Sequence, residues 1–484
     1  MMTQITLHGA VGEIGGNKIL IEEGDTRIFF DFGLSFGRWG EYFSPYLQPR
    51  KWNYISDFIK LGLLPDLDGL YRPDYEERLR ESTKEPKFDG IILSHPHLDH
   101  AGFLSFIRSD IPVYCSTGCK AILQAIEETA YGFHEYTHIK EAFKLRPSKR
   151  DSSKIVKDKD SRIQRQINIL ETTTKIDDLT IHTYPVDHSV PGATSFIIET
   201  KEGAIVYTGD IRFHGRRGNE SDIFVEKAKS FDPLLIISEG TNIEEPTSFG
   251  EMDLQQKLFS LVENIPGLIT VNFPVRDMDR MRSFIEAAKH ADRTLVVNLK
   301  QAYTLRILEE NGVKNMPTID EISIFIPKKG WGILNDINYP IEIQMRDYQT
   351  WENELIERTN SVSADDINKH PKDFIYRCDF FELKNLFEVN PPEGSIFIRS
   401  VTEPVDEEME LDHKKAINWL MFFGLHPYEQ IHCSGHASGY DIREMIKKIS
   451  PKYVMPVHTE NPDAFNTFHS NVIQKGLGVR YSLS

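Results

Sequence analysis

Residues 92–102 read ILSHPHLDHAG, so three histidines and one aspartate fall within six residues directly after an apolar run. His95 and His97 alternate with other residues, and in an extended segment their side chains point the same way. Asp99 and His100 follow at the expected start of a helix and face the same point. Imidazole suits zinc and a carboxylate compensates its charge, whereas such groups buried without partners are costly. The spacing therefore favours a metal site over a surface turn that is rich in histidine by chance.

Three further candidate ligands each follow an apolar run. His188 stands in YPVDHSVPG, Asp210 in IVYTGDIRF and His458 in VMPVHTE. An aspartate at a strand end is more often a turn former, so each is weak alone. Together they share one context, because loops at one edge of a sheet are where sites are built. We therefore expect all three beside the histidine cluster.

The elements that must position these residues are short strands with helices between them. Residues 1–33 indicate three strands, with Gly24-Asp25 as a turn between two of them. Further apolar runs predict strands over 88–94, 111–116, 179–186, 194–200 and 203–210, and a helical pattern covers 118–133. This mixture predicts stacked sheets with helices outside.

The pattern changes near residue 241. From there to about 402, helical stretches alternate with short apolar strands, which predicts an α/β arrangement with parallel strands. After residue 405 the closely spaced helix and strand patterns of the first part return. We expect one domain made of 1–240 and 405–484, with a second domain, 241–404, inserted in it.

Composition limits the function classes. The chain of 484 residues is 40% hydrophobic and carries 56 basic against 73 acidic residues, a net charge of −17. An acidic total argues against nonspecific coating of nucleic acid or anionic membrane by the whole surface. The four cysteines lack paired CxxC spacing, so neither a disulfide framework nor a zinc ribbon is indicated. No leader pattern and no apolar run of membrane-spanning length is seen, which predicts a cytoplasmic protein.

One segment, 144–165, is strongly basic. It carries nine Lys or Arg against three Asp and few apolar residues, so we expect a loop or lid and not core. A solvated surface insertion is the ordinary interpretation of such a charge run. The functional alternative is a lip that attracts phosphates.

The motifs together resemble a known family. HPHLDH, the downstream His188, TGD with Asp210, and Asp31 resemble the metallo-β-lactamase superfamily. SEGT, HCSGHAS and PVHTE resemble the later motifs of its β-CASP nucleases, and the H-x-S-G-H-A form is closest to the ribonuclease J branch. The motifs occur in family order along nearly the whole chain. The resemblance implies an α/β protein: an αββα metallo-β-lactamase sandwich with a two-metal site at one sheet edge and an inserted α/β β-CASP domain that forms a cap over a strand-binding cleft.

The resemblance also implies roles for individual residues. One zinc would be held by His95, His97 and His188, and a second by Asp99, His100 and His458, with Asp210 bridging them, Asp31 orienting a ligand histidine, and manganese as the alternative metal. Catalysis is assigned to His436, Glu239 and Asp99, and substrate contacts to His432, Ser434, Gly435 and Ser438. The implied activity is cleavage of single-stranded RNA, as 5′ exonuclease, endonuclease or both, by a two-metal-activated hydroxide. His436, oriented by Glu239, would protonate the leaving oxygen; from the residues alone it reads equally well as a capping histidine in a Ser-Gly turn.

Two departures from the branch stand out. Where that branch has a Gly-Ser-Gln-Gly-Glu-Pro element, this sequence has FIRSVTEPVDEEMEL. The sequence also ends soon after His458, without the additional C-terminal domain of many ribonuclease J proteins. A homodimer is compatible with this resemblance, and the oligomeric state stays open.

Three other functions remain open from the sequence. A β-CASP nuclease acting on DNA has the same chemistry. A small-molecule hydrolase of lactone or thioester type is disfavoured by Glu239, His436 and the insertion. An inactive relative used as a binding module is disfavoured by the intact set of candidate ligands.

Overall fold

The computed structural model describes residues 2–50, 53–76, 85–130, 134–141, 144–157, 162–247, 249–404 and 407–483. The chain folds as two compact units. Unit 1 comprises 1–213, 217–247 and 435–484, and unit 2 comprises 214–216 and 248–434. No helix in the described part of the chain has the length and apolar character needed to cross a membrane.

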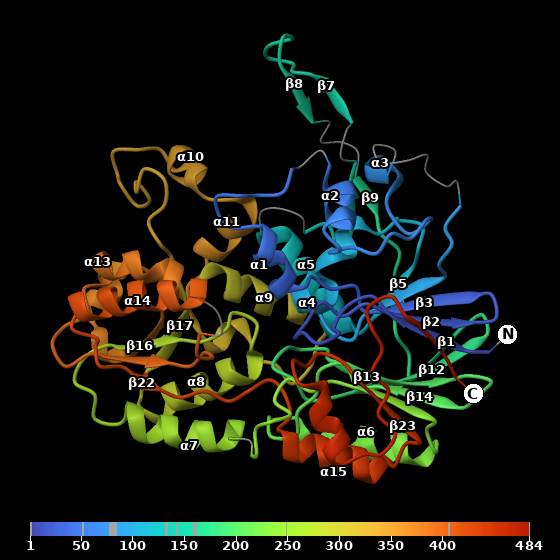
Figure 1. Cartoon of the computed structure of the whole chain (residues 1–484). Helices are drawn as coiled ribbons and strands as arrows, with labels where there is room; N and C mark the ends of the chain where they lie inside the picture. The colour runs from blue at the N-terminus through green and yellow to red at the C-terminus, as the bar shows by residue number, and fades with distance from the viewer. Residues whose placement is uncertain are drawn as a thin grey trace. The chain divides into compact units, whose positions relative to one another are not determined.

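Unit 1 contains two sheets that pack face to face (Figure 1). The first has the order β10-β5-β4-β3-β2-β1-β24 and the second β11-β12-β13-β14-β15-β23. The strands of the first are β1 (Gln4–Leu7), β2 (Ile19–Glu23), β3 (Thr26–Phe30), β4 (Gly90–Ile92), β5 (Val113–Cys115), β10 (Ile167–Ile169) and β24 (Arg480–Ser482). Those of the second are β11 (Thr173–Ile176), β12 (Leu179–Pro185), β13 (Thr194–Glu199), β14 (Ala204–Tyr207), β15 (Leu235–Ser238) and β23 (Tyr453–Pro456).

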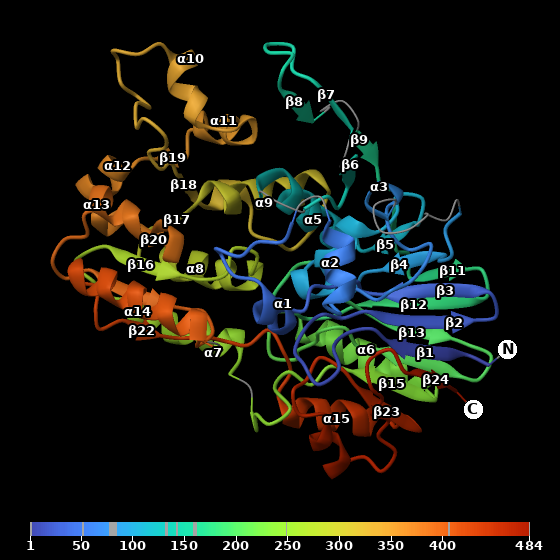
Figure 2. The same ribbon diagram turned by 45° about the horizontal axis from the view of Figure 1, so that its top comes forward.

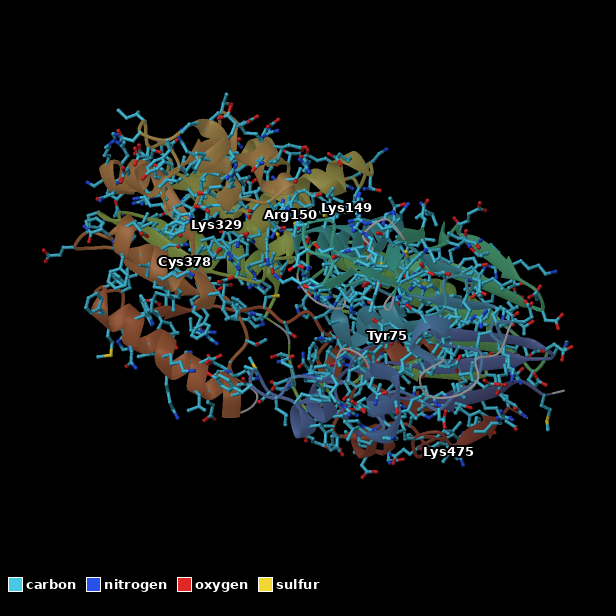
Figure 3. All side chains as sticks on the ribbon, turned by 90° about the horizontal axis from the view of Figure 1, so that it is seen from above. Tyr75, Lys149, Arg150, Lys329, Cys378 and Lys475 are labelled. Atoms are coloured by element: carbon cyan, nitrogen blue, oxygen red, sulfur yellow. The ribbon has the colours of Figure 1, made fainter. Side chains whose placement is uncertain are left out.

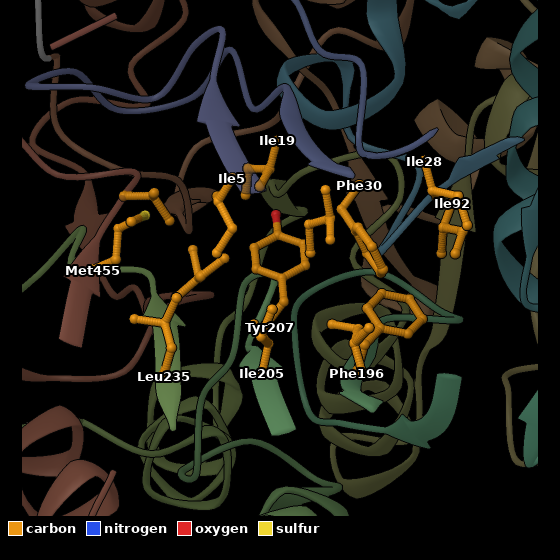
Figure 4. Close-up of a cluster of buried hydrophobic side chains, with 14 of the residues drawn as sticks. Ile5, Ile19, Ile28, Phe30, Ile92, Phe196, Ile205, Tyr207, Leu235 and Met455 are labelled. Atoms are coloured by element: carbon orange, nitrogen blue, oxygen red, sulfur yellow. The ribbon is translucent and has the colours of Figure 1, made fainter. Parts of the chain in front are cut away.

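A layer of buried apolar side chains holds the two sheets together. Ile5, Ile19 and Phe30 from the first sheet meet Phe196 and Leu235 from the second (Figure 4). The ring of Phe30 lies edge-on to that of Phe196, with 5.5 Å between centroids, a favourable aromatic geometry. This double-sided burial explains why the strands read as continuous apolar runs in the sequence.

Helices cover the outer faces of both sheets. They are α1 (Phe36–Tyr42), α2 (Tyr54–Lys60), α3 (Pro73–Glu76), α4 (Leu98–Ala101), α5 (Thr117–Thr129), α6 (Gly218–Ser230) and α15 (Gly439–Ile449), with 3₁₀ turns η1 (Gly102–Phe106) and η6 (Pro462–Thr467). A second apolar cluster joins α6 and α15 to the outer face of the second sheet, through Phe224 and Ile446 against Val206 and Ile236. The αββα sandwich expected from the sequence is therefore confirmed.

Unit 2 is an α/β unit around one sheet with the order β19-β18-β17-β20-β16-β21-β22, and every pairing in it is parallel (Figure 2). Its strands are β16 (Ile269–Asn272), β17 (Thr294–Val297), β18 (Ser323–Phe325), β19 (Ser361–Val362), β20 (Phe374–Arg377), β21 (Ile396–Arg399) and β22 (Glu429–Gln430). Its helices are α7 (Glu251–Val262), α8 (Met278–His290), α9 (Leu299–Glu310), α10 (Ile341–Gln344), α11 (Thr350–Ile356), α12 (Ala364–Lys369), α13 (Leu386–Val389) and α14 (Glu407–Phe422), with 3₁₀ turns η2 (Ile319–Glu321), η3 (Met345–Asp347), η4 (Pro371–Asp373) and η5 (Phe380–Asn385). The parallel strands expected for this region are present.

The unit boundaries differ from the expected ones at the return to the first domain. The sequence places the return at residue 405, whereas unit 2 continues to Ser434. The physical reason is that β22 pairs with β21, and Leu420 and Leu425 pack into the apolar core of unit 2. An amphipathic helix and a short strand do not reveal in the sequence which core they join.

Candidate metal centre

The candidate site of unit 1 is built from the ends of its strands. Strands β3 and β4 pair in parallel, and so do β14, β15 and β23. The residues that follow these strand ends, and the end of β12, are Asp31, His95, His188, Asp210, Glu239 and His458. Parallel strands bring their carboxyl ends to one edge, so residues distant in sequence meet there.

Two of these residues have an unusual backbone. Asp31 and His458 adopt φ values of 60° and 52°. This left-handed region is uncommon for residues other than glycine and is found preferentially at functional sites.

The first candidate ligand group contains His95, His97, His188 and Asp210. His97 Nδ1 lies 3.1 Å from both His95 Nε2 and His188 Nε2. Asp210 Oδ2 lies 3.4 Å from His95 Nε2 and 3.7 Å from His188 Nε2. All four ligand atoms lie within 4.8 Å of one another, as the sharing of one metal ion requires.

The second group contains Asp99, His100, His458 and, again, Asp210. His458 Nε2 lies 3.1 Å from Asp99 Oδ2, and His100 Nε2 lies 3.2 Å from Asp210 Oδ1. Asp210 thus turns Oδ2 toward the first group and Oδ1 toward the second. That is the arrangement of a carboxylate shared between two metal positions.

The chemistry of this donor set fits divalent metal ions. Among the described residues, His100 Nε2 and Asp210 Oδ1 are buried and approach each other at 3.2 Å, but neither atom makes a bond of hydrogen-bond geometry. Buried polar atoms of this kind are costly unless something binds them. Burial lowers the pKa of His97 to about 4 and the pKa of His95 and His188 well below the ordinary value, which favours the neutral imidazole that ligates metal. At His100 burial is outweighed by the carboxylates of Asp210 and Asp31, which raise the pKa well above that value.

Three ligand histidines are oriented by a hydrogen bond from Nδ1. His188 Nδ1 donates to the carbonyl oxygen of Gly435 at 2.6 Å, and His458 Nδ1 lies 2.8 Å from the hydroxyl of Thr241. His100 Nδ1 donates to Asp31 Oδ2 at 2.8 Å. Each bond directs Nε2 toward the centre and fixes the tautomer that can bind a metal.

Asp31, which orients His100, is itself held by several hydrogen bonds. Its carboxylate accepts from the Ser94 backbone N–H and hydroxyl, both at 2.7 Å, and from the Tyr207 hydroxyl at 2.6 Å. The Tyr207 ring stands between the two sheets with its hydroxyl away from the β14 backbone (Figure 4), and Asn17 Nδ2 donates to that hydroxyl at 3.0 Å. Sequence reasoning missed Tyr207, Asn17 and Thr241; Thr241 follows SEG directly, which is the one local signal among the three.

We expect Asp31→Asn to lower zinc affinity by about 10–100-fold, the usual effect of losing an outer hydrogen-bond partner of a ligand histidine. Asparagine also tolerates a left-handed backbone, so the change is confined to the hydrogen-bonding pattern at His100. Competition with a chelator measures the effect. Tyr207→Phe removes one donor to Asp31 and should give a smaller loss; an equal loss in both variants would mean that Asp31 does not act through His100.

His436 and Glu239 form a pair beside the second group. His436 Nδ1 lies 2.9 Å from Glu239 Oε2 and 3.8 Å from Asp210 Oδ2. Glu239 Oε1 accepts from the Ile211 backbone N–H at 2.7 Å, which holds the carboxylate in place. Burial disfavours a protonated His436, but the carboxylates of Glu239 and Asp210 outweigh it and raise the pKa of His436 to about 9. Because Nδ1 faces Glu239, a proton passed to a substrate must come from Nε2.

The four residues assigned to substrate contacts fall in different surroundings. Ser438 is the N-cap of α15: its hydroxyl accepts from the Asp441 N–H at 3.2 Å and donates to Asp441 Oδ2 at 2.8 Å. Gly435 orients His188, as described above. His432 and Ser434 belong to unit 2, where the Ser434 carbonyl oxygen accepts from His214 Nε2 at 3.1 Å. Ser438 therefore caps a helix, a structural role that its motif did not predict.

Comparison with known proteins finds two family models along the chain. Residues 65–262 match a beta-lactamase superfamily domain. Residues 427–476 match a Zn-dependent metallo-hydrolase RNA specificity domain. The matched ranges include every candidate metal ligand and also His436 and Glu239.

Relatives with known names match the chain over almost its whole length. Ribonuclease J of Pyrococcus abyssi is 23% identical over 95% of this chain and 90% of the relative. Ribonuclease J of Thermus thermophilus is 24% identical over 93% of this chain and 67% of the relative, and that of Helicobacter pylori is 21% identical over 94% and 56%. The chain therefore spans little more than half of the Helicobacter protein. A crystal structure of a protein of unknown function from Enterococcus faecalis has the same fold, with a TM-score of 0.72, 23% identity and full coverage of both chains.

Proposed function

Because the chain belongs to the metallo-β-lactamase superfamily, in its β-CASP, ribonuclease J-like group, we propose that it is a zinc-dependent nuclease of single-stranded RNA. It would cleave phosphodiester bonds from the 5′ end, internally, or in both ways. The observation that carries the proposal is the sharing of Asp210 between two ligand groups, with the His436–Glu239 pair beside them.

The candidate ligands form two sets, one for each proposed metal ion. His95, His97 and His188 would hold one zinc ion, Asp99, His100 and His458 the other, and Asp210 both. Two such ions supply an activated water at neutral pH and neutralise charge on a reacting phosphate. The histidine-rich set favours zinc, and manganese is the alternative.

The proton for the leaving group would come from the chain itself. A ribose oxygen is a poor leaving group unless it is protonated as the bond breaks. His436 would donate the Nε2 proton to that oxygen, and Glu239 would hold the imidazole through Nδ1 and stabilise its protonated form. A thiolate leaves more readily without a proton, so a thioester hydrolase has less need of such an acid, and the pair favours a substrate with an oxygen leaving group such as a phosphodiester.

The proposed substrate is single-stranded RNA. Relatives that match this chain over more than nine-tenths of its length are named ribonuclease J, and the second family model is described as an RNA specificity domain. RNA is therefore proposed over DNA, and the homodimer remains a proposal that sedimentation would test.

The proposal is tested with 5′-labelled single-stranded RNA and DNA of the same sequence, incubated with purified protein with and without chelator. We expect cleavage of RNA that chelator abolishes, with little cleavage of DNA. Equal cleavage of both would reassign the protein as a nuclease without sugar discrimination, and cleavage of neither would overturn the proposal. The sizes of the labelled products distinguish exonucleolytic from endonucleolytic cleavage.

A further inference from the structure

The described part of the basic segment contains paired β-strands, where the sequence predicted a loop or lid. Strand β7 (Leu145–Pro147) pairs antiparallel with β8 (Ile155–Lys157), and β6 (His138–Lys140) pairs with β9 (Arg162–Gln164). The first pair is nested within the second along the chain. Figures 1 and 2 draw β7 and β8 as a thin ribbon apart from the two large sheets of unit 1. We call residues 144–157 the basic hairpin; they contain six Lys or Arg and a single acidic residue, Asp151.

The β6–β9 pair, between whose strands the basic hairpin lies in the chain, is held by two charged side chains. Glu127 on α5 accepts through Oε2 from the backbone N–H groups of Tyr136 and Thr137 at 2.9 and 2.6 Å. Arg165, just after β9, is buried and donates to the carbonyl oxygens of Leu104 and Arg108 at 3.1 Å. Arg165 is thus part of the anchor and not of the exposed charge with which the sequence grouped it. The β6–β9 pair is therefore anchored just before β6 and just after β9.

The charge of the hairpin is exposed. Lys149 and Arg150 (labelled in Figure 3) lie at its tip and make no ion pair among the described residues. Lys154 pairs with Asp151 at 3.3 Å, but both side chains are largely exposed, so this pair contributes little stability. Leu145 and Ile155 are 55% and 61% exposed, so the ribbon has no apolar core of its own. The described residues therefore place no carboxylate partner against Lys149 or Arg150.

We propose that the basic hairpin is an RNA-binding arm that contacts phosphates outside the metal centre. This inference rests on the proposed RNA substrate. A chain of net charge −17 repels a polyanion, so a long RNA needs a local cationic surface to be held. A two-stranded ribbon exposes both of its faces. Contacts from it to the sugar-phosphate backbone of RNA suit a flexible strand of any sequence. The arm holds the part of a long RNA that does not occupy the metal centre.

The test measures RNA binding as a function of salt, by fluorescence anisotropy in the presence of chelator to prevent cleavage. The test variant is Lys149→Gln/Arg150→Gln. The matched control is Lys175→Gln/Lys227→Gln, which removes the same charge from exposed lysines that likewise lack a carboxylate partner in the described part of unit 1. Lys149→Arg/Arg150→Lys keeps the charge at the tip. Lys159, another cation of the segment, lies outside the described residues.

We expect the test variant to flatten the slope of log affinity against log salt by about 0.7 for each phosphate contact that is lost. Its affinity for a long RNA should fall more than its affinity for a trinucleotide, because only the long strand reaches the arm. The control and the charge-preserving variant should both keep the wild-type slope. Retention of the slope by the test variant, or an equal change in the control, would overturn the inference.

Two further outcomes separate this inference from the proposed function. If the wild-type protein fails to cleave RNA without chelator but the test variant still changes the slope, the nuclease proposal fails and the arm stands. If the RNA slope is unchanged but the sedimentation coefficient of the protein changes, the hairpin binds the acidic surface of a second copy. The RNA inference is then wrong.

Discussion

Asp210→Ala is expected to lower the metal content of both positions and to abolish cleavage of RNA. Asp210 is the single residue shared by the two ligand groups, with Oδ2 3.4 Å from His95 Nε2 and Oδ1 3.2 Å from His100 Nε2. Metal ions at a reacting phosphate contribute several kcal/mol to the transition state, so the rate should fall by about 10³-fold or more. Elemental analysis of the purified variant gives the metal content, and hydrolysis of labelled RNA gives the rate.

The control for this variant is Asp222→Ala, which removes an exposed carboxylate from α6 and should keep both metals. Circular dichroism tests whether Asp210→Ala is still folded. A folded Asp210→Ala protein with the full metal content would show that Asp210 is not the bridge, and the assignment of two metal positions would fail.

His436→Ala is expected to separate catalysis from metal binding. His436 Nδ1 is held by Glu239 Oε2 at 2.9 Å, so the proposed proton donation would come from Nε2. The variant should keep both metals and most of its affinity for single-stranded RNA. Its rate should fall by about 10²–10⁴-fold, the usual effect of losing a general acid. The loss should appear in kcat more than in KM, because contacts to the ground state survive.

An aryl phosphodiester with an activated leaving group distinguishes the acid from a ligand. Such a leaving group needs no proton, so His436→Ala should be nearly normal on it and impaired on RNA. His436 also lies in a third cluster with Asp210, Glu239 and His458, whose ligand atoms are within 4.8 Å of one another. If metal is lost, or if both substrates are affected equally, His436 is a metal ligand or a phosphate contact and not the acid.

Glu239→Gln should give the same kind of defect at a smaller size. Glutamine can keep the bond from the Ile211 N–H through its carbonyl oxygen, but it loses the charge that stabilises a protonated His436. A variant with normal kcat and altered KM would mean that Glu239 positions substrate and does not orient the acid.

The candidate ligands were accessible from the sequence because their signals are local. His95, His97, Asp99 and His100 occupy one strand end and one helix start, where the side-chain direction follows from backbone geometry. His188, Asp210 and His458 each follow an apolar strand, and parallel strands bring such ends to one edge whatever lies between them. The resemblance to a nuclease family then assigned roles that residue types alone did not distinguish, above all for His436.

Only the tertiary structure decided what surrounds these residues. Tyr207 reaches Asp31 across the sandwich from the second sheet, and Asn17 donates to the hydroxyl of that tyrosine. No periodicity in the sequence marks a tyrosine whose hydroxyl has that role. Arg165 belongs by composition to a basic segment, yet it is buried and bound by carbonyl oxygens, whereas Lys149 and Arg150 of the same segment are exposed. Strand ends and residue types that can bind metal are recognisable from short stretches of sequence. Hydrogen-bond partners depend on which distant segments pack together, and so does whether a charged side chain is buried or exposed.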